Sequence, residues 1–479
     1  MKIRLKECYN VNMKKLLFFL IFPVIWASAA FAFDLPGLPW GIPQDIKPKT
    51  LNKYIVENIV VEEINYTCSN YGGNDVNIFG FLCYPLAKKE LPAVIVVHGG
   101  GGYAYLERSL VWARLGYASL CIDLPGKGIG RSISRSTGPD MTVENLFKSS
   151  PGLTDNYLYH AVKAARGAIT FLSGRENIDR DKIGMVGLSW GGVITLITNG
   201  LDQRLAAAIP VFGSGYLTEG STWQEYLDSK LPEKERKSFQ EHFDPSNFLR
   251  YQHAPVYYVT GTNDNCFYLP NFIRSYLMIP ANKKMYIYPN IRHMVNEDMF
   301  QNIIKYCDSR LKGANDLPDI FVKPIEEDAT NIYIPIKTSG RDPTKRVDLY
   351  YCGPDLRGWT KKKWESREAY FSRGTQWVKF AREEISPEII FYASATDIKG
   401  ASVSSPLYSI MRFRVNDQRD VFVTSLPIDK INYHYLDRNS LEKILNGPVQ
   451  SRNDRIPLRF FWDIGGKLSV DKAFNLTLP

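Results

Sequence analysis

The sequence lacks several features that would assign it to a large class of proteins. It has no Cys-x-x-Cys spacing and no cluster of cysteine and histidine residues, so we expect no zinc site and no other metal site. It has no basic stripe with interleaved aromatic residues, so nucleic acid is not an expected partner. What remains is an ordinary globular composition, 44% hydrophobic and 23% charged, in 479 residues that suffice for two or three folded units.

Long hydrophobic runs are also scarce, and the strongest lies near the N-terminus. A Lys-Lys pair precedes the apolar segment 16–26, and a small-residue segment ending at Ala32 follows. This order is typical of a cleavable secretory signal peptide, and translation from either Met1 or Met13 is compatible with it. We therefore expect a signal peptide over residues 1–32, a secreted or periplasmic mature chain, and no stable membrane insertion after cleavage.

Cysteines are few and their spacing is uninformative. Six of the seven follow the predicted signal peptide, and export permits disulfides, but the sequence selects no pairing among them. The formal net charge of +9 falls to +5 once the five basic residues and one acidic residue of the signal peptide are removed. Neither feature indicates an oligomeric state.

The chain after the signal peptide begins with an extended lead-in, rich in Pro and Gly, over residues 33–54. Val60–Tyr66 and Asn77–Tyr84 then flank a turn signal at Gly72–Asp75, which predicts an antiparallel hairpin at a sheet edge.

Short apolar runs alternate with helical segments through the middle of the chain. The predicted strands are Ala93–Val97, Tyr117–Ile122, Lys182–Val186, Leu205–Val211, Val256–Thr260 and Lys284–Tyr288, and the predicted helices are Leu106–Leu115, Asp155–Leu172 and Gly191–Asn199. Such alternation predicts a mostly parallel sheet flanked by helices, hence an α/β domain over residues 55–312.

Two segments depart from this α/β pattern. Residues 213–250 hold two short polar helices, Trp223–Lys230 and Glu233–His242, which form either a small cap over the sheet's C-terminal edge or a surface excursion without a role. Residues 315–479 alternate at period two with recurring turn residues, which predicts one or more β-rich, sandwich-like C-terminal domains.

A G-x-S-x-G motif lies between a predicted strand and a predicted helix. It runs from Gly187 to Gly191 with Ser189 at its centre. In this setting the serine occupies a sharp turn, and side chains at the two glycine positions would collide with neighbouring backbone. Ser189 is therefore the candidate nucleophile.

A serine hydroxyl needs an adjacent base that is itself oriented by an acid. In the α/β-hydrolase order the acid follows the serine and the histidine comes last. Asp264 and His293 each come just after a predicted strand, whereas His253 precedes a strand and His434 lies in the β-rich tail. The expected catalytic triad is Ser189, Asp264 and His293.

The oxyanion of the tetrahedral intermediate needs two preorganised N–H donors. Trp190, directly after the nucleophile, supplies the first. The glycine-rich loop after an earlier strand supplies the second, for which we favour Gly100 and then Gly101. His98, at the start of this loop, is expected to hold the loop rather than act as a second base.

Two neighbouring features have structural interpretations. The glycine-rich segment Asp123–Gly130 lacks the G-x-x-x-x-G-K-[ST] pattern of a phosphate loop and is expected to shape the rim of the pocket. Cys266 has no spare base beside it, so packing or a disulfide is expected rather than nucleophilic catalysis. No cofactor is expected.

These motifs resemble the acetylxylan esterase and dienelactone hydrolase-like branch of the α/β-hydrolases, a branch related to prolyl oligopeptidase. The resemblance covers roughly residues 55–312 and includes His98–Gly102, Gly187–Gly192, Phe243–Ser246, Gly261–Asp264 and His293; Val347–Tyr351, Gly358-Trp359 and Lys363-Trp364 also look like the β-rich tail of some such proteins. It implies removal of acetyl groups from sugar or polysaccharide. Dienelactone hydrolases proper have a cysteine where this chain has Ser189, so their activity is not implied.

The leading hypothesis is a secreted serine carboxylic ester hydrolase acting on acetylated carbohydrate or similar small acyl esters. The alternative is a serine peptidase of the prolyl oligopeptidase type, but only about 60 mature residues precede the strand at Val94, and a propeller needs about 40–50 residues for each blade. A third hypothesis is a non-catalytic binding protein on the same fold. The intact predicted triad argues against it.

Overall fold

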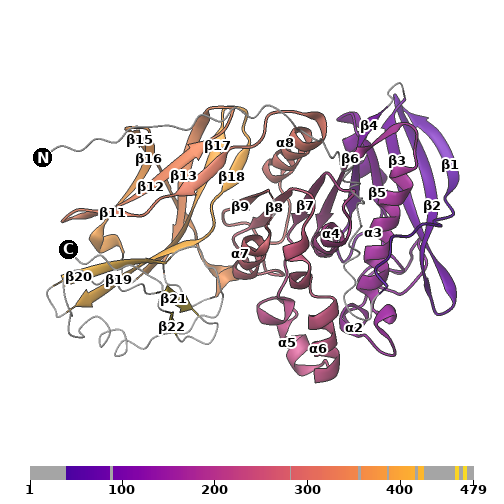
Figure 1. The fold of residues 1–479 in the computed structure, drawn as a ribbon, viewed down its shortest axis with the longest axis horizontal. Helices are drawn as coiled ribbons and strands as arrows, with labels where there is room; N and C mark the ends of the chain where they lie inside the picture. The colour runs from indigo at the N-terminus through magenta and orange to yellow at the C-terminus, as the bar shows by residue number, and fades with distance from the viewer. Residues whose placement is uncertain are drawn as a thin grey trace, which may run out of the picture.

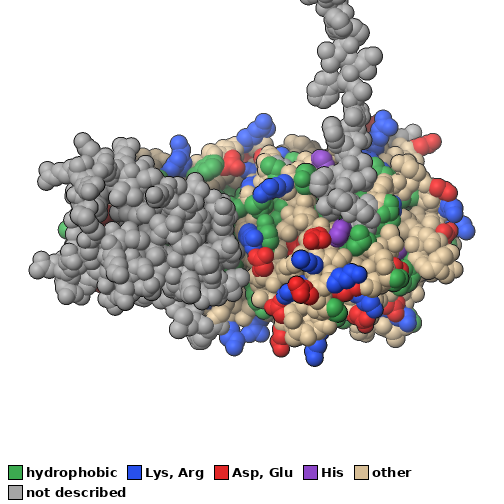
Figure 2. Space-filling model, turned by 60° about the horizontal axis from the view of Figure 1, so that its bottom comes forward, with side chains coloured by type: hydrophobic (Ala, Val, Ile, Leu, Met, Phe, Trp, Pro, Cys, Tyr) green, Lys and Arg blue, Asp and Glu red, His purple; other side chains and the backbone are tan. Residues whose placement is uncertain are grey.

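The computed structural model describes residues 39–86, 90–280, 282–353, 358–385, 388–415, 419–425, 459–462 and 468–471. The predicted signal peptide, residues 1–32, lies outside the described residues, as does His434. Figure 1 shows an α/β region beside a region built of β-strands. On the face shown in Figure 2, acidic and basic side chains are interspersed over the α/β region.

Three antiparallel strands form one edge of the main sheet. β1 (Lys49–Val56) pairs with β2 (Ile59–Tyr71), which pairs with β3 (Asn74–Pro85) through a turn whose two glycines have φ values of 57° and 82°. The hairpin is confirmed. The predicted lead-in over residues 33–54 is wrong from Lys49 onward, where β1 begins. The sequence did not reveal this strand because it is mostly exposed and has little of the apolar alternation that signals a strand.

The remaining strands of this sheet run parallel to one another. They are β4 (Leu91–Val97), β5 (Ala118–Ile122), β6 (Ile178–Leu188), β7 (Ala207–Val211), β8 (Val256–Gly261) and β9 (Lys283–Tyr288), and the sheet order is β1-β2-β3-β5-β4-β6-β7-β8-β9. The chain leaves β4 toward one edge of the sheet and leaves β6 toward the other. A crevice is expected between the loops that follow two such strands.

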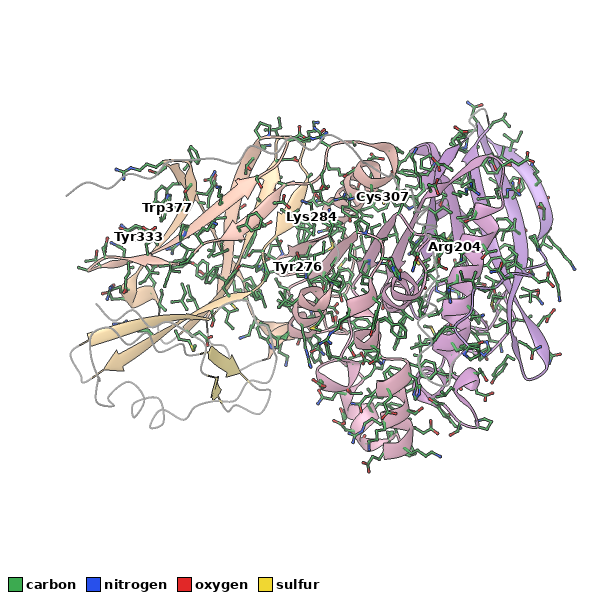
Figure 3. All side chains as sticks on the ribbon, in the orientation of Figure 1. Arg204, Tyr276, Lys284, Cys307, Tyr333 and Trp377 are labelled. Atoms are coloured by element: carbon green, nitrogen blue, oxygen red, sulfur yellow. The ribbon has the colours of Figure 1, made fainter. Side chains whose placement is uncertain are left out.

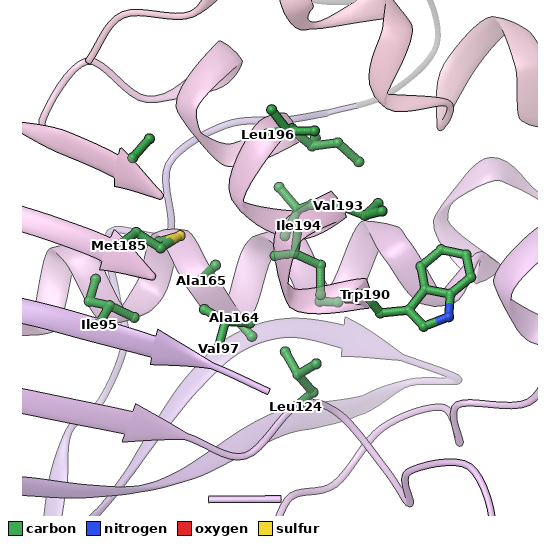
Figure 4. Packing of buried hydrophobic residues seen from close by; sticks show 14 of the residues in the cluster. Ile95, Val97, Leu124, Ala164, Ala165, Met185, Trp190, Val193, Ile194 and Leu196 are labelled. Carbon is green, nitrogen blue, oxygen red and sulfur yellow. The ribbon is translucent and has the colours of Figure 1, made fainter. Parts of the chain in front are cut away.

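Helices cover both faces of the sheet, as predicted. α3 (Tyr157–Ser173), α4 (Trp190–Leu201) and α7 (Leu269–Met278) pack on one face, and α1 (Leu106–Arg114) and α8 (Glu297–Lys312) pack on the other. The strand β4 shows why both faces are apolar: Ile95 and Val97 join the first core cluster, whereas Val94 and Val96 join the second. Figure 4 shows the first cluster, in which β4 meets α3 and α4.

The insertion forms the two predicted helices, α5 (Gln224–Ser229) and α6 (Glu233–His242). The short helix α2 (Val143–Phe147) comes much earlier in the chain, between β5 and α3. The polar surface of the insertion conceals a buried apolar side. Phe239 of α6 is fully buried, and its ring lies 4.8 Å from the ring of Phe147 on α2. The insertion is therefore packed onto the α/β region.

The C-terminal region is a sandwich of two antiparallel sheets, as predicted. One sheet contains β10 (Asp319–Val322), β11 (Glu326–Glu327), β12 (Asn331–Ser339), β15 (Tyr370–Ser372) and β16 (Thr375–Ala381); the other contains β13 (Thr344–Cys352), β14 (Glu365–Glu368), β17 (Glu388–Asp397), β18 (Ser402–Ser404), β19 (Tyr408–Val415) and β20 (Arg419–Ser425). Ile334 of the first sheet and Phe391 of the second are buried in one cluster. A separate pair, β21 (Arg459–Trp462) and β22 (Leu468–Asp471), follows.

The sandwich packs against the edge of the main sheet. Buried residues of α8, β8 and both sandwich sheets belong to one hydrophobic cluster. The Tyr257 hydroxyl donates to the Ser402 carbonyl at 2.8 Å, and Lys284 forms a 2.6 Å ion pair with Asp319 at the junction, where Figure 3 labels it. The boundary near residue 312 therefore divides the sequence, but the hydrophobic core is continuous across it.

None of the six described cysteines, Cys68, Cys83, Cys121, Cys266, Cys307 and Cys352, is in a disulfide. Among the described residues, no helix is both long enough and apolar enough to cross a membrane.

Candidate active site

Ser189 occupies a strained turn between β6 and α4. Its φ of 59° and ψ of −119° lie outside the regions that a serine ordinarily adopts. The flanking glycines are required sterically: a Cβ on Gly187 would lie 2.0 Å from the Gly191 carbonyl oxygen, and one on Gly191 would lie 2.3 Å from the Val97 carbonyl oxygen. The Ser189 N–H donates to the Val211 carbonyl at 2.7 Å, which fixes the turn to the neighbouring strand.

The structure brings the three predicted triad residues together. His293 Nε2 lies 2.8 Å from Ser189 Oγ, and His293 Nδ1 lies 2.9 Å from Asp264 Oδ1. The same Oδ1 accepts the backbone N–H groups of Cys266 at 2.8 Å and Phe267 at 3.1 Å. Because an ionised carboxylate only accepts, Nδ1 carries the ring proton, and Nε2 is free to accept the serine proton.

Two further histidines, His242 and His160, have other partners. His242 also follows Ser189 in the chain, but its Nδ1 lies 2.9 Å from the carbonyl oxygen of Ser238 on its own helix. His160 is buried in α3 between Ser69 and the Thr154 carbonyl. Burial lowers the pKa of His160 to about 4, so it is neutral at physiological pH.

His98 has the structural role predicted for it. Its Nδ1 lies 2.7 Å from the Gly99 carbonyl oxygen, and its Nε2 accepts the Leu124 N–H at 3.0 Å. The ring therefore links the loop after β4 to the loop after β5. The Ile129 N–H completes this link by donating to the Gly100 carbonyl at 2.7 Å.

The glycine loop after β4 lies directly against the nucleophile. A Cβ added to Gly99 would lie 3.0 Å from Ser189 Cβ, and one added to Gly100 would lie 3.2 Å from Trp190 Cδ1. The glycine loop therefore packs against Ser189 and Trp190. Which of Gly100 and Gly101 donates to an oxyanion stays a prediction.

Aromatic side chains wall the site. The His293 ring lies 5.1 Å from the ring of Phe212 and 5.9 Å from that of Phe267. Trp223, directly before α5 in the insertion, lies 4.9 Å from Trp190 and 4.8 Å from Phe267, measured between ring centroids. The insertion therefore contacts the active-site loops, as a cap would, rather than lying apart from them.

The C-terminal sandwich also supports the site, through two asparagines that sequence reasoning missed. Asn263, beside the acid, donates through Nδ2 to the carbonyls of Thr360 at 3.2 Å and Lys362 at 2.7 Å. Asn290, on the loop that carries the base, exchanges two hydrogen bonds of 2.8 and 2.9 Å with the backbone of Trp364. One segment of the sandwich thus holds both loops.

Cys266 is half-buried and forms no disulfide. Burial, with a smaller contribution from the charge of Asp264, raises the pKa of its thiol to about 11. The sulfur is therefore protonated at neutral pH. Of the two roles predicted for Cys266, packing or a disulfide, the disulfide is absent, and that Cys266 is not the nucleophile stays a prediction.

A mostly parallel sheet with a serine at its strand–helix elbow, and with an acid and a histidine on loops after later strands, defines an α/β-hydrolase. The resemblance found in the sequence is borne out at the family level. The acetyl xylan esterase (AXE1) family model matches residues 50–309, and the chain belongs to that family.

Individual relatives are more distant. The chain is 27% identical over 205 residues to acetyl esterase Axe7A of Xylanibacter ruminicola, a match that covers 40% of this chain and 46% of that protein. The chain therefore spans less than half the length of that relative. An acetyl xylan esterase from Paenibacillus sp. R4 superposes with a TM-score of 0.48 at 21% identity, covering 56% of this chain and 89% of the other. Acetyl xylan esterase 1 from Thermoanaerobacterium sp. JW/SL YS485 gives a TM-score of 0.48 at 18% identity, over 55% and 87%.

Proposed function

We propose that this protein is a serine carboxylic ester hydrolase that removes acetyl or other small acyl groups from carbohydrate or similar esters. The observation that carries the proposal is the continuous hydrogen-bonded chain from Asp264 through His293 to Ser189, with contacts of 2.9 and 2.8 Å. Membership of the acetyl xylan esterase family supports the proposal that the acyl group is acetyl and that the ester is one of a carbohydrate.

In the proposed reaction each group has its own role. Ser189 Oγ attacks the ester carbonyl while His293 Nε2 takes its proton, and the imidazolium then protonates the leaving alcohol. Asp264 keeps the ring in the required tautomer and stabilises its positive charge. Water, activated by the same histidine, attacks the acyl-enzyme and releases the acid. The Trp190 N–H and an N–H of Gly100 or Gly101 stabilise the oxyanion.

The substrate class is tested by comparing ester and amide substrates on purified protein. We expect hydrolysis of p-nitrophenyl acetate and of acetylated xylo-oligosaccharides, with activity falling as the acyl chain of the p-nitrophenyl ester lengthens. Ser189→Ala is the control and should be inactive on all of them. Cleavage of Gly-Pro-p-nitroanilide with a higher kcat/KM than the acetates would favour the peptidase instead.

We also propose that the protein is exported and that residues 1–32 are removed. The proposal rests on the order of charged, apolar and small residues before Phe33. N-terminal sequencing of the protein recovered from a secreting host should begin at Phe33. Recovery from the cytoplasm with an intact N-terminus would contradict export.

A further inference from the structure

Three groups at the acid end of the triad form a cluster that hydrolysis uses only in part. A carboxylate oxygen of Asp264, the sulfur of Cys266 and a ring nitrogen of His293 all lie within 4.8 Å of one another. Carboxylate, thiolate and imidazole are the side-chain ligands that bind zinc and similar cations. We propose that these three residues form an inhibitory site for a thiophilic divalent cation of the Zn²⁺ and Cd²⁺ type.

The electrostatics of Asp264 point to a cation. Its Oδ1 accepts three hydrogen bonds, but its Oδ2 is buried and has no hydrogen-bond partner among the described residues. A buried carboxylate oxygen without a partner is unfavourable, because desolvation is not compensated. Within the described part of the chain, the only basic side chain paired with Asp264 is His293. A cation bound by the Asp264 carboxylate would balance its charge, and one bound through Oδ2 would also give that oxygen a partner.

The geometry needs little adjustment. In a tetrahedral zinc site with bonds of about 2.0–2.3 Å, the ligand atoms lie about 3.3–3.8 Å apart. The three atoms here all lie within 4.8 Å of one another, so reaching that spacing requires shifts of about 1 Å. The site is open to solvent on one side, since the His293 side chain is 19% exposed.

Binding and hydrolysis exclude each other. The thiol of Cys266 releases its proton to solvent, and its sulfur forms a bond to the cation. If Nδ1 of His293 is the ligand, the ring proton moves to Nε2, so Nε2 can no longer accept the proton of Ser189, and the hydrogen bond to Asp264 is lost. If Nε2 is the ligand, its lone pair can no longer accept the proton of Ser189. Either way the serine loses its base. Inhibition rests on the proposed hydrolase function, whereas binding of the cation does not.

The first experiment measures binding on the full chain carrying Ser189→Ala, which holds the cluster but cannot hydrolyse ester. Addition of Cd²⁺ should produce the ultraviolet charge-transfer band of a cadmium–thiolate bond, saturating at one ion for each chain. Adding Cys266→Ala should abolish the band. Adding Cys83→Ala instead is the matched control, because that thiol is buried in a separate cluster between β2, β3 and α1, and the band should persist.

The second experiment measures p-nitrophenyl acetate hydrolysis, each variant being referred to its own metal-free rate. Cd²⁺ and Zn²⁺ should inhibit the unaltered chain, and a chelator should restore it. Cys266→Ala should raise the Cd²⁺ concentration for half-inhibition by more than about 30-fold, since one of three ligands is lost. Mg²⁺, which prefers oxygen ligands, should have no effect.

The outcomes separate the two proposals. No thiolate band in Ser189→Ala, a band that survives Cys266→Ala, or equal inhibition of the Cys266→Ala variant and the unaltered chain would overturn the metal site. A Cys266-dependent band in a protein without esterase activity would keep the metal site and refute the proposed function.

Discussion

Removing the side chain of Asn290 should loosen the loop that carries the catalytic base. Asn290 makes two hydrogen bonds with the Trp364 backbone, and its φ of 56° lies in the left-handed region that asparagine and glycine tolerate better than alanine. Each hydrogen bond contributes about 1 kcal/mol, and placing alanine in this backbone conformation costs about 1 kcal/mol more. Asn290→Gly should therefore cost about 2 kcal/mol of local stability, and Asn290→Ala about 3 kcal/mol.

Hydrogen exchange at the Trp364 amide measures this local stability directly, because that N–H donates to Asn290 Oδ1 at 2.9 Å. An opening free energy lowered by about 2 kcal/mol corresponds to roughly 30-fold faster exchange in Asn290→Gly, and about 3 kcal/mol to more than about 100-fold in Asn290→Ala. With the His293 ring less well placed, kcat should fall about 10- to 100-fold while KM changes little. Unchanged exchange in both variants, with kcat within about twofold of the original, would refute this role of the sandwich.

Two further predictions concern the elbow and the pH dependence of stability. Gly191→Ala should abolish activity and destabilise the fold by about 3 kcal/mol or more, because its Cβ would lie 2.3 Å from the Val97 carbonyl oxygen. Gly174→Ala is the control, because the nearest atom to its Cβ would lie 3.6 Å away. In urea unfolding and ester assays, the control should keep the stability and the activity of the unaltered chain. Burial holds the pKa of His160 near 4 in the fold against 6.5 for a free histidine, so between these pH values the unfolded chain binds more protons, and stability should rise with pH. Urea unfolding of His160→Gln across this window should show a flatter rise, and an identical slope in the two proteins would contradict the assignment.

The meeting of Ser189, Asp264 and His293 could be predicted because its signals are local. Short apolar runs mark strands buried on both faces, the glycines at 187 and 191 mark a turn with no room for a Cβ, and Asp264 and His293 each follow a buried strand. Chain order then restricts which acid and which histidine can meet the serine. The fold of the α/β region follows from the same strand signals.

The missed features depend on contacts distant in sequence or on surfaces without an apolar pattern. β1 is largely exposed, so its side chains show little of the apolar alternation that would predict a strand. Asn263 and Asn290 form hydrogen bonds with main-chain atoms of the sandwich. Every residue type has these main-chain atoms, so the sequence of the sandwich does not indicate such partners. Only the three-dimensional packing of the sandwich against the sheet reveals them.

Covalent labelling of the nucleophile tests the central claim most directly. A fluorophosphonate should modify the full chain once, and mass spectrometry of the digest should place the adduct on Ser189. Labelling should be lost in Ser189→Ala and strongly slowed in His293→Ala, because the hydroxyl then lacks its base. An adduct on a different residue, or undiminished ester hydrolysis by Ser189→Ala, would contradict the account.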